Sequence, residues 1–385
     1  MGFTKLDMVF VDTLKKRGAL VGGGLLLALL AGAAAGWYFG GRPGAPAQPA
    51  IILGDAAKGT EGMAWVPGGV FQMGSDHKLA QANERPAHAV RIKGFWMDTT
   101  HVTNNQFAEF VRQTGYVTTA ERKPDWDTIR VQLPPGVPKP PDDVLVPGAM
   151  VFVGTSRPVR LDDYSQWWRY VPGADWRHPQ GPDSSIEGKG DHPVVQVSHE
   201  DALAYARWAG KRLPTEAEWE FAARGGLEQA TYVWGNDLMP EGQRLANYWD
   251  TRDRPFPVVN PVISPKAGGA TGTMPAKTFP ANGYGLYDMT GNAWQWVADW
   301  YRADFFALQA RIAGKKTSDN PTGPADSFDP DDPGVPMNAP RKVIRGGSFL
   351  CNEDYCLSYR PSARRGSDPH SPMSHVGFRL VKDAS

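Results

Sequence analysis

The residues of this chain whose spacing most directly indicates chemistry are its two cysteines. Cys351 and Cys356 are the only cysteines among 385 residues, and they follow a Gly346-Gly347 pair with Ser348 and Tyr355 as close neighbours. Two sulfurs this close along the chain can form a disulfide, or they can bind a soft metal ion as thiolates. A thiolate pair suits Cu(I), whereas structural Zn²⁺ takes four nitrogen or sulfur ligands. A structural disulfide stays open as the alternative, because it is the commoner use of such a pair in an exported protein.

The overall composition is that of a globular protein with balanced charge. The 41 Lys and Arg residues equal the 41 Asp and Glu residues, which gives no support for nucleic acid as a partner. The 43 Gly, 34 Pro and 14 Trp residues favour a loop-rich fold with aromatic packing over a helical bundle. The length allows one large domain or two modest ones.

The N-terminal part of the chain differs from the rest. Lys15-Lys16-Arg17 precedes an uncharged, mostly apolar run over 18–41 that is long enough to span a bilayer. We therefore predict a cytoplasmic N-terminus (1–17), a single-pass anchor in the inner (plasma) membrane (18–41), an extended linker (42–60) and an extracytoplasmic domain (61–385). A cleaved signal peptide is the alternative, because the Ala33-Ala34-Ala35 run resembles a cleavage site.

Several local patterns predict strands and helices in the domain. Alternating residues around Pro67-Gly68-Gly69 predict a hairpin over 64–74. Capping boxes that begin at Thr103, Ser198 and Thr215 predict three helices, the first and last of which end at a glycine. Further strands are expected over 89–97 and 376–381.

Residues 122–191 are rich in Pro, Asp and aromatic side chains and show little periodicity. A segment of this length without regular structure is typical of a functional surface or an ordered lid. Trp167-Trp168 and the run from Trp176 to Ser184 can line a groove for an extended peptide. A hydrophobic cluster packed beneath a loop explains the same composition equally well.

A short span over 283–296 concentrates glycines, oxygen-bearing side chains and tryptophans. Asp288 and Gln295, together with carbonyl groups of the intervening turn, can supply oxygen ligands to Ca²⁺. The spacing differs from that of an EF-hand, so a turn held by hydrogen bonds from its Asp and Asn side chains is the alternative.

The motifs together resemble those of the formylglycine-generating enzymes, the sulfatase-modifying factors, from about Met63 to Val381. The Ser and Tyr neighbours of the cysteine pair make that segment the most specific part of the resemblance. The matching segments are the Pro-Gly-Gly turn, the helix at Thr103, Trp176–Ser184, His192–Val194, Gly210–Glu220, Gly285–Trp296, Gly346–Cys356 and Gly377–Arg379.

The resemblance implies a fold and a reaction. The fold class is α+β with low regular secondary structure, the formylglycine-generating-enzyme fold, a variant of the C-type-lectin-like architecture, after an N-terminal transmembrane helix. Family members use O₂ and Cu(I) to oxidise a cysteine in a Cys-x-Pro-x-Arg motif of an unfolded sulfatase to Cα-formylglycine. By position, Cys351 and Cys356 bind the copper, and Ser348 and Tyr355 orient oxygen species or water.

The resemblance also implies residues that bind the substrate polypeptide. Trp176, Arg177 and Asp183 match one part of this substrate wall. His375 stands where Asn is usual, which implies an altered substrate preference and a pH dependence from the imidazole. The expected partners are thus an unfolded sulfatase and, through the N-terminal helix, a membrane, without nucleic acid.

Family members bind Ca²⁺ at positions that match Asp288, Gly291, Ala293 and Gln295, the middle two through their carbonyl groups. Asp and Gln stand here where Asn and Glu are familiar, which retains oxygen ligands. A second calcium position matches Asn247 and the Tyr248 carbonyl, but its acidic ligand falls on Gly268, which leaves that set incomplete.

Two other functions compete with the copper oxidase. A non-heme iron enzyme of the sulfoxide-synthase kind needs a facial set of His or carboxylate ligands, and the 8 histidines show no paired spacing that indicates one. A non-catalytic binding module on a lectin-like scaffold would instead keep Cys351 and Cys356 as a disulfide.

Overall fold

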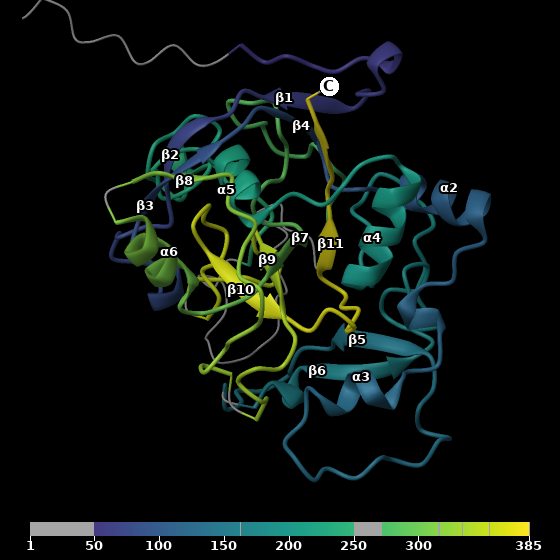
Figure 1. Cartoon of the computed structure of the whole chain (residues 1–385). Coiled ribbons are helices and arrows are strands. Elements are labelled where there is room, and N and C mark those ends of the chain that lie inside the picture. Colours follow the sequence, from purple (N-terminus) through teal and green to yellow (C-terminus); the bar gives the residue numbers. More distant parts are fainter. Residues whose placement is uncertain are drawn as a thin grey trace, which may run out of the picture. The chain divides into compact units, whose positions relative to one another are not determined.

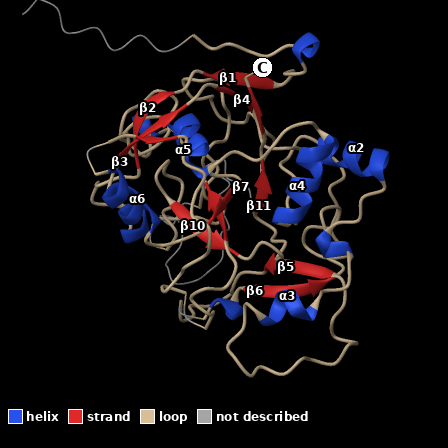
Figure 2. Cartoon of the chain, in the orientation of Figure 1, coloured by secondary structure: helices blue, strands red, loops and turns tan. Residues whose placement is uncertain are grey.

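Short strands and helices joined by long connections make up the described chain (Figure 1, Figure 2). The computed structural model describes residues 50–161, 163–249, 272–314, 316–332, 334–353 and 355–384. Within these ranges, every helix is too short or too polar to cross a bilayer. The cytoplasmic segment predicted at 1–17 and the membrane anchor predicted at 18–41 lie outside the described residues and stay predictions.

A mostly antiparallel sheet carries the strands that flank the cysteines. Its order is β10 (Arg364–Ser367), β9 (Lys342–Arg345), β7 (Trp294–Trp300) and β11 (Val376–Phe378). The β9 strand pairs antiparallel with both β10 and β7, and β11 runs parallel to β7. The segment that joins β9 to β10, here called the cysteine loop (346–363), therefore begins and ends on neighbouring strands.

The other described strands form three smaller sheets. One has the order β1 (Met63–Val66), β4 (Phe95–Asp98) and β12 (Val381–Asp383). Another has the order β2 (Gly69–Met73), β3 (His88–Ile92) and β8 (Ser318–Asp319), and the last pairs β5 (Gly148–Phe152) with β6 (Trp168–Pro172).

The hairpin predicted over 64–74 is wrong in its pairing. The β1 strand pairs with β4, whereas β2 pairs with β3, so the Pro-Gly-Gly turn carries the chain from one sheet into the next. A Cβ atom on Gly68, whose φ is +71°, would lie 2.5 Å from the Ile92 carbonyl oxygen, so the chain must have glycine at this crossing. Alternation and turn residues identify strands but leave their partners open. The strand expected over 89–97 is likewise divided between β3 and β4, and that over 376–381 between β11 and β12.

The three helices predicted from capping boxes are confirmed. They are α2 (Asn104–Thr114), α4 (His199–Trp208) and α5 (Glu216–Arg224), and each has its Ser or Thr side chain and its N3 side chain in the reciprocal pattern. Both α2 and α5 end at a glycine in the left-handed conformation, as expected. Two further helices are α3 (Trp126–Arg130) and α6 (Phe305–Ala313).

Helix α5 packs against the central sheet and ties it together through buried charges. The Arg345 guanidinium, at the end of β9, donates to Glu216 at 2.8 Å and to Glu220 at 2.7 Å. Arg364, at the start of β10, donates to the same Glu216 carboxylate at 2.6 and 2.7 Å. Because these side chains are almost completely buried, each charge depends on its partners. The pairs fix both ends of the cysteine loop.

Two segments that composition placed outside the regular fold belong to it. The Ile52 carbonyl accepts from Trp65 N at 2.8 Å, and Leu53 forms a β-bridge with Ala64. The described folded unit therefore includes residues 50–60, which composition assigned to the linker. The aromatic region over 122–191, in which little regular structure was expected, contains α3, β5 and β6.

Candidate active site

The cysteine loop leaves β9 through two glycines that no larger residue can replace. Gly346 and Gly347 have φ values of +92° and +70°. A Cβ atom on Gly346 would lie 2.6 Å from the Met289 carbonyl oxygen. The Gly291 amide donates to the Gly346 carbonyl at 2.8 Å, and the Phe349 amide donates to the Asn292 carbonyl at 3.1 Å. The turn over 288–295 therefore supports the start of the loop.

The two cysteines lie side by side and are joined as a disulfide, with their Cα atoms 4.8 Å apart. Cys351 is buried, whereas Cys356 is partly exposed. Asn352 shapes the turn between them, because its carbonyl accepts from the Cys356 amide at 3.3 Å and its Oδ1 accepts from the Tyr355 amide at 2.8 Å. The loop thus brings the two sulfurs together, which is the feature that both the disulfide and the metal interpretation require.

Ser348 is fully buried beside the cysteines and has two polar neighbours. Its Oγ accepts from the Leu350 amide at 3.2 Å and lies 3.3 Å from Nδ1 of His375. Burial lowers the pKa of His375 to about 3, so the imidazole is neutral near pH 7. The pH dependence expected from this imidazole is therefore not supported in the neutral range.

Two aromatic side chains pack around Tyr355 and His375 at this corner of the site. They are Trp167, which directly precedes β6, and Trp168, the first residue of β6. The Trp167 ring meets the Tyr355 ring edge to face at 6.0 Å, and the Trp168 ring meets His375 at 4.7 Å. Tyr355 is 48% exposed, so its phenol reaches the surface. The sequence indicates a groove lined by this tryptophan pair, but no local pattern connects the pair with Tyr355 or His375.

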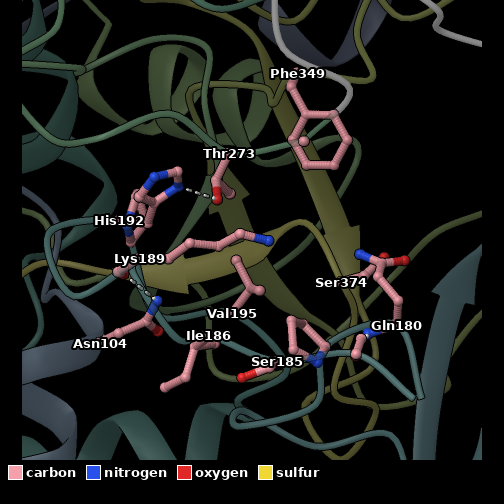
Figure 3. A pocket seen from close by; sticks show the side chains of 14 residues that line it. Asn104, Gln180, Ser185, Ile186, Lys189, His192, Val195, Thr273, Phe349 and Ser374 are labelled. Atoms are coloured by element: carbon pink, nitrogen blue, oxygen red, sulfur yellow. Dashed lines mark hydrogen bonds between the residues drawn. The ribbon is translucent and has the colours of Figure 1, made fainter. Parts of the chain in front are cut away.

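A pocket of about 520 Å³ lies next to this corner (Figure 3). Phe349, which follows Ser348, and Ser374, which precedes His375, line one part of it. The segment over 179–195 lines another part, and the Lys189 side chain extends across the view in Figure 3. His192 Nδ1 lies 3.0 Å from Thr273 Oγ1 at the pocket wall. Among the lining residues, Pro179, Gln180 and Ser184 belong to the run that the sequence indicates as lining a groove.

The substrate-wall residues expected from the resemblance take three different positions. Trp176 is 2% exposed and packs against Phe107, so it belongs to the hydrophobic core and does not face a groove. Arg177 covers the Trp176 ring at 4.2 Å and donates to Glu121 at 2.7 Å. Asp183 is exposed. Neighbouring residues line the pocket instead, namely Pro179, Gln180, Ser184, Ser185 and Ile186.

Three of the four residues expected to bind calcium over 288–295, Asp288, Ala293 and Gln295, have an expected ligand oxygen that accepts a hydrogen bond from another group. Gln295 Oε1 accepts from Trp219 Nε1 at 2.9 Å and from Arg379 Nε at 2.7 Å. The Ala293 carbonyl accepts from His101 Nε2 at 2.9 Å, and Asp288 Oδ2 accepts from a backbone amide at 2.9 Å. Gly291 is held through its amide by the cysteine loop. This donor set does not fit a calcium ion, which prefers six or more oxygen ligands that are free to bind it.

The second calcium position is only partly described. Asn247 Oδ1 is buried and finds no hydrogen-bond donor among the described residues. The Tyr248 carbonyl accepts from Arg244 at 2.9 Å. Gly268, where the acidic ligand falls, lies outside the described residues, so this position stays a prediction.

The cysteine pair fits a soft metal ion better than any other described group does. Among the described residues, no three or more His, Cys, Asp or Glu side chains gather closely enough to hold a metal. Cys351 and Cys356 supply two soft donors at one place, and the partial exposure of Cys356 leaves an approach for a third ligand. Reduction of the disulfide must precede binding, because the thiolate is the metal ligand.

Comparisons with known proteins identify the family. The model of the sulfatase-modifying factor enzyme 1-like domain matches residues 50–384. The formylglycine-generating enzyme of Mycobacterium tuberculosis is 46% identical over 318 residues, which cover 83% of this chain and 96% of that protein. The enzyme of the same name from Thermomonospora curvata is 44% identical over 326 residues, covering 84% and 94%.

A solved structure shares the fold. The structure of PvdO from Pseudomonas aeruginosa is 23% identical, has a TM-score of 0.52, and matches over 88% of this chain and 100% of that one. The resemblance found in the sequence, and the expected mixed fold with little regular secondary structure, are therefore confirmed. The chain belongs to the family of sulfatase-modifying factor enzyme 1-like domains.

Proposed function

We propose that this chain converts a cysteine in a Cys-x-Pro-x-Arg segment of an unfolded sulfatase to Cα-formylglycine, with O₂ as oxidant and Cu(I) as cofactor. Relatives named formylglycine-generating enzymes match this chain over nearly their whole length. The observation that carries the proposal is the placement of Cys351 and Cys356 side by side, on a loop fixed at both ends and adjacent to a pocket.

In this proposal the cysteine loop has two chemical states. As a disulfide it has no thiolate to offer a metal, and a thiol reductant converts it to the competent dithiol. Cys351 and Cys356 would then hold the copper, which would supply the one-electron chemistry that O₂ needs. The partly exposed side of Cys356 is where the substrate cysteine approaches as a third sulfur.

The neighbouring side chains orient the reactants. Ser348 Oγ accepts from the Leu350 amide and pairs with His375 Nδ1, and the low pKa of His375 keeps this imidazole neutral. The remaining hydrogen-bonding capacity of the Ser348 hydroxyl can position a water molecule. Burial raises the pKa of Tyr355, so its phenol stays a hydrogen-bond donor at neutral pH. Trp167 and Trp168 form apolar walls that exclude bulk water from this corner.

The electron balance of the proposed reaction requires an external thiol. Loss of two hydrogens from the substrate Cβ and sulfur gives a thioaldehyde, and water converts the thioaldehyde to the aldehyde with release of H₂S. Reduction of O₂ to water takes four electrons, of which the substrate supplies two. Oxidation of two external thiols to a disulfide supplies the others.

The deciding experiment is aerobic incubation of the reduced, copper-loaded protein with a Cys-x-Pro-x-Arg peptide and a thiol. Mass spectrometry should show loss of the peptide sulfur and gain of an aldehyde that a hydrazide reagent captures. A peptide with Ser in place of Cys is the matched substrate control. The Cys351→Ser and Cys356→Ser variants should each abolish turnover. The control variant Tyr164→Phe, which changes an exposed side chain outside the cysteine loop, should keep turnover.

The outcome also separates the competing functions. Full turnover by Cys356→Ser would contradict the copper assignment. Iron in place of copper in the active protein would favour the sulfoxide-synthase alternative. A protein whose two sulfurs resist reduction and that never turns over peptide would be the non-catalytic binding module.

A further inference from the structure

The amide group of Gln295 lies in a fully buried network beneath the cysteine loop. Its Oε1 accepts from Trp219 Nε1 at 2.9 Å and from Arg379 Nε at 2.7 Å. Its Nε2 donates to the Met289 carbonyl at 3.0 Å and, less closely, to the Asp288 carbonyl at 3.5 Å. Every donor and acceptor position of the amide is therefore in use.

This network fixes which way the amide faces. In the opposite orientation, Nε2 would face the Trp219 and Arg379 N–H groups, and the oxygen would face two carbonyl oxygens. Both sets of contacts would then be repulsive in a site without water. The hydrogen-bonding partners thus assign the nitrogen to the side of the Met289 and Asp288 carbonyls.

A glutamate at this position would meet a different situation. One carboxylate oxygen could keep the contacts with Trp219 and Arg379, but the other would face the two carbonyl oxygens without a proton to donate. Oxygen atoms gathered in this way are what a hard cation binds. The resemblance places glutamate and calcium at this position in related chains. In this chain the N–H groups of Gln295 occupy the space in which a cation would balance those oxygens.

Two further side chains complete the replacement of a metal. His101 donates through Nε2 to the Ala293 carbonyl at 2.9 Å, so this expected ligand has a donor of its own. Arg379 donates through Nη2 to the Tyr287 carbonyl at 2.7 Å and to the Asp288 carbonyl at 3.2 Å. A guanidinium group stays protonated in proteins at neutral pH. The turn therefore already contains a fixed positive charge.

We propose that Gln295, with His101 and Arg379, replaces the calcium ion at the turn over 288–295, so that this chain supports its cysteine loop without that metal. A glutamate at position 295 would restore the requirement. Gln295 lies directly against the start of the cysteine loop. A Cβ atom on Gly346 would lie 3.1 Å from Gln295 Nε2 and 2.6 Å from the Met289 carbonyl oxygen, which accepts a hydrogen bond from Gln295 Nε2. The proposal concerns this turn alone and does not rest on the proposed enzymatic reaction.

The test is thermal unfolding of the full chain in EDTA and in excess calcium. The midpoint of the wild-type protein should be the same in both solutions. The Gln295→Glu variant should unfold at a lower temperature in EDTA, and calcium should raise its midpoint by roughly 5 °C or more. Gln309→Glu is the matched control, because Gln309 is also buried and its Oε1 contacts His88 rather than a group of carbonyls. This control should show no calcium response.

The contrary outcomes are equally specific. If calcium stabilises the wild-type protein, Asn247→Ala decides which position responds, since Asn247 belongs to the other calcium position. A response that Asn247→Ala abolishes belongs to that position and leaves the proposal standing, whereas a response that persists overturns it. A folded Gln295→Glu variant that ignores calcium also overturns it. If this variant fails to fold, the wild-type and Asn247→Ala titrations decide alone.

Discussion

The Oγ atom of Ser348 lies 3.3 Å from Nδ1 of His375, across 27 residues of sequence. The Leu350 amide donates to the same Oγ, so the hydroxyl group joins a backbone amide and the imidazole. The pair joins the cysteine loop to the residue that precedes β11, and Trp168 covers the imidazole from β6. Three separate parts of the chain thus meet around the imidazole of His375.

Replacement of His375 should test what this hydrogen bond contributes. His375→Ala removes the partner of the Ser348 hydroxyl, and we expect kcat for the peptide reaction to fall about tenfold, which corresponds to one modest hydrogen bond. His375→Asn offers an amide oxygen in its place and should keep most of the activity. Since the pKa of His375 is about 3, none of these variants should change the shape of the pH profile between neutral and weakly alkaline pH.

His370→Ala is the matched control for this measurement, because His370 is exposed and lies on the segment just before His375. Its kcat should equal that of the wild-type protein. A His375→Ala variant with unchanged kcat, or a wild-type profile with a step that His375→Asn removes, would contradict the positioning role of a neutral imidazole.

Loss of the Glu84–Arg360 pair should destabilise the second half of the cysteine loop. Arg360 donates to the two Glu84 oxygens at 2.6 and 2.7 Å, and it also holds the Leu357 carbonyl at 3.0 Å. Both partners are almost fully buried. Glu84→Gln leaves a buried guanidinium without its counter-charge, which should lower the free energy of unfolding by about 3–5 kcal/mol. Denaturant unfolding followed by tryptophan fluorescence measures this loss.

Glu109→Gln is the control for that pair. Glu109 also pairs with an arginine, Arg112, but both side chains face solvent. Water can therefore replace the lost partner, and the variant loses little stability. The denaturation midpoint should stay at the wild-type value. An equal loss of unfolding free energy in the two variants would contradict the expectation that burial of the Glu84–Arg360 pair causes its effect on stability.

Asp299 should make stability depend on pH in a defined direction. Burial, followed by the nearby Glu216 carboxylate, raises the pKa of Asp299 to about 7. In the unfolded chain an Asp has a pKa near 3.9. The folded state therefore holds an extra proton between these values, and its stability falls as the pH rises through that window. At about 1.4 kcal/mol per pKa unit, the loss above pH 7 amounts to roughly 4 kcal/mol.

Asp299→Asn should remove this loss. The asparagine oxygen can still accept the hydrogen bond that the Glu216 amide donates to Asp299 at 2.8 Å. The variant should be more stable than the wild-type protein at pH 8, and the difference should shrink as the pH falls towards 4. Denaturant midpoints across this range measure it, with Asp326→Asn as the control at an exposed carboxylate. A difference that is constant with pH would refute the assignment.

Local interactions explain what the sequence predicted correctly. The helices that begin after Thr103, Ser198 and Thr215 are specified by side chains that bond backbone groups within one turn, so their signal is complete in a few residues. The closeness of Cys351 and Cys356 is likewise a consequence of their short separation. The motifs around them were specific enough to indicate the family before any contact was known.

Tertiary contacts decided the strand pairing and the position of Trp176, because these contacts join residues that no local sequence pattern relates. The Pro-Gly-Gly turn identified two strands, but only competition among all strands paired β1 with β4 and β2 with β3. Burial of Trp176 against Phe107 removed it from the surface that its motif predicted.

The same contrast separates the two candidate sites. The sequence alone determined that two sulfurs stand together and which family carries them, since both follow from residues close along the chain. Only the tertiary structure placed Trp219 and Arg379 on Gln295, and so decided that an expected calcium ligand is a hydrogen-bonded amide. A side chain's ligands are set by whatever the fold packs around it, and here those groups come from 76 and 84 residues away.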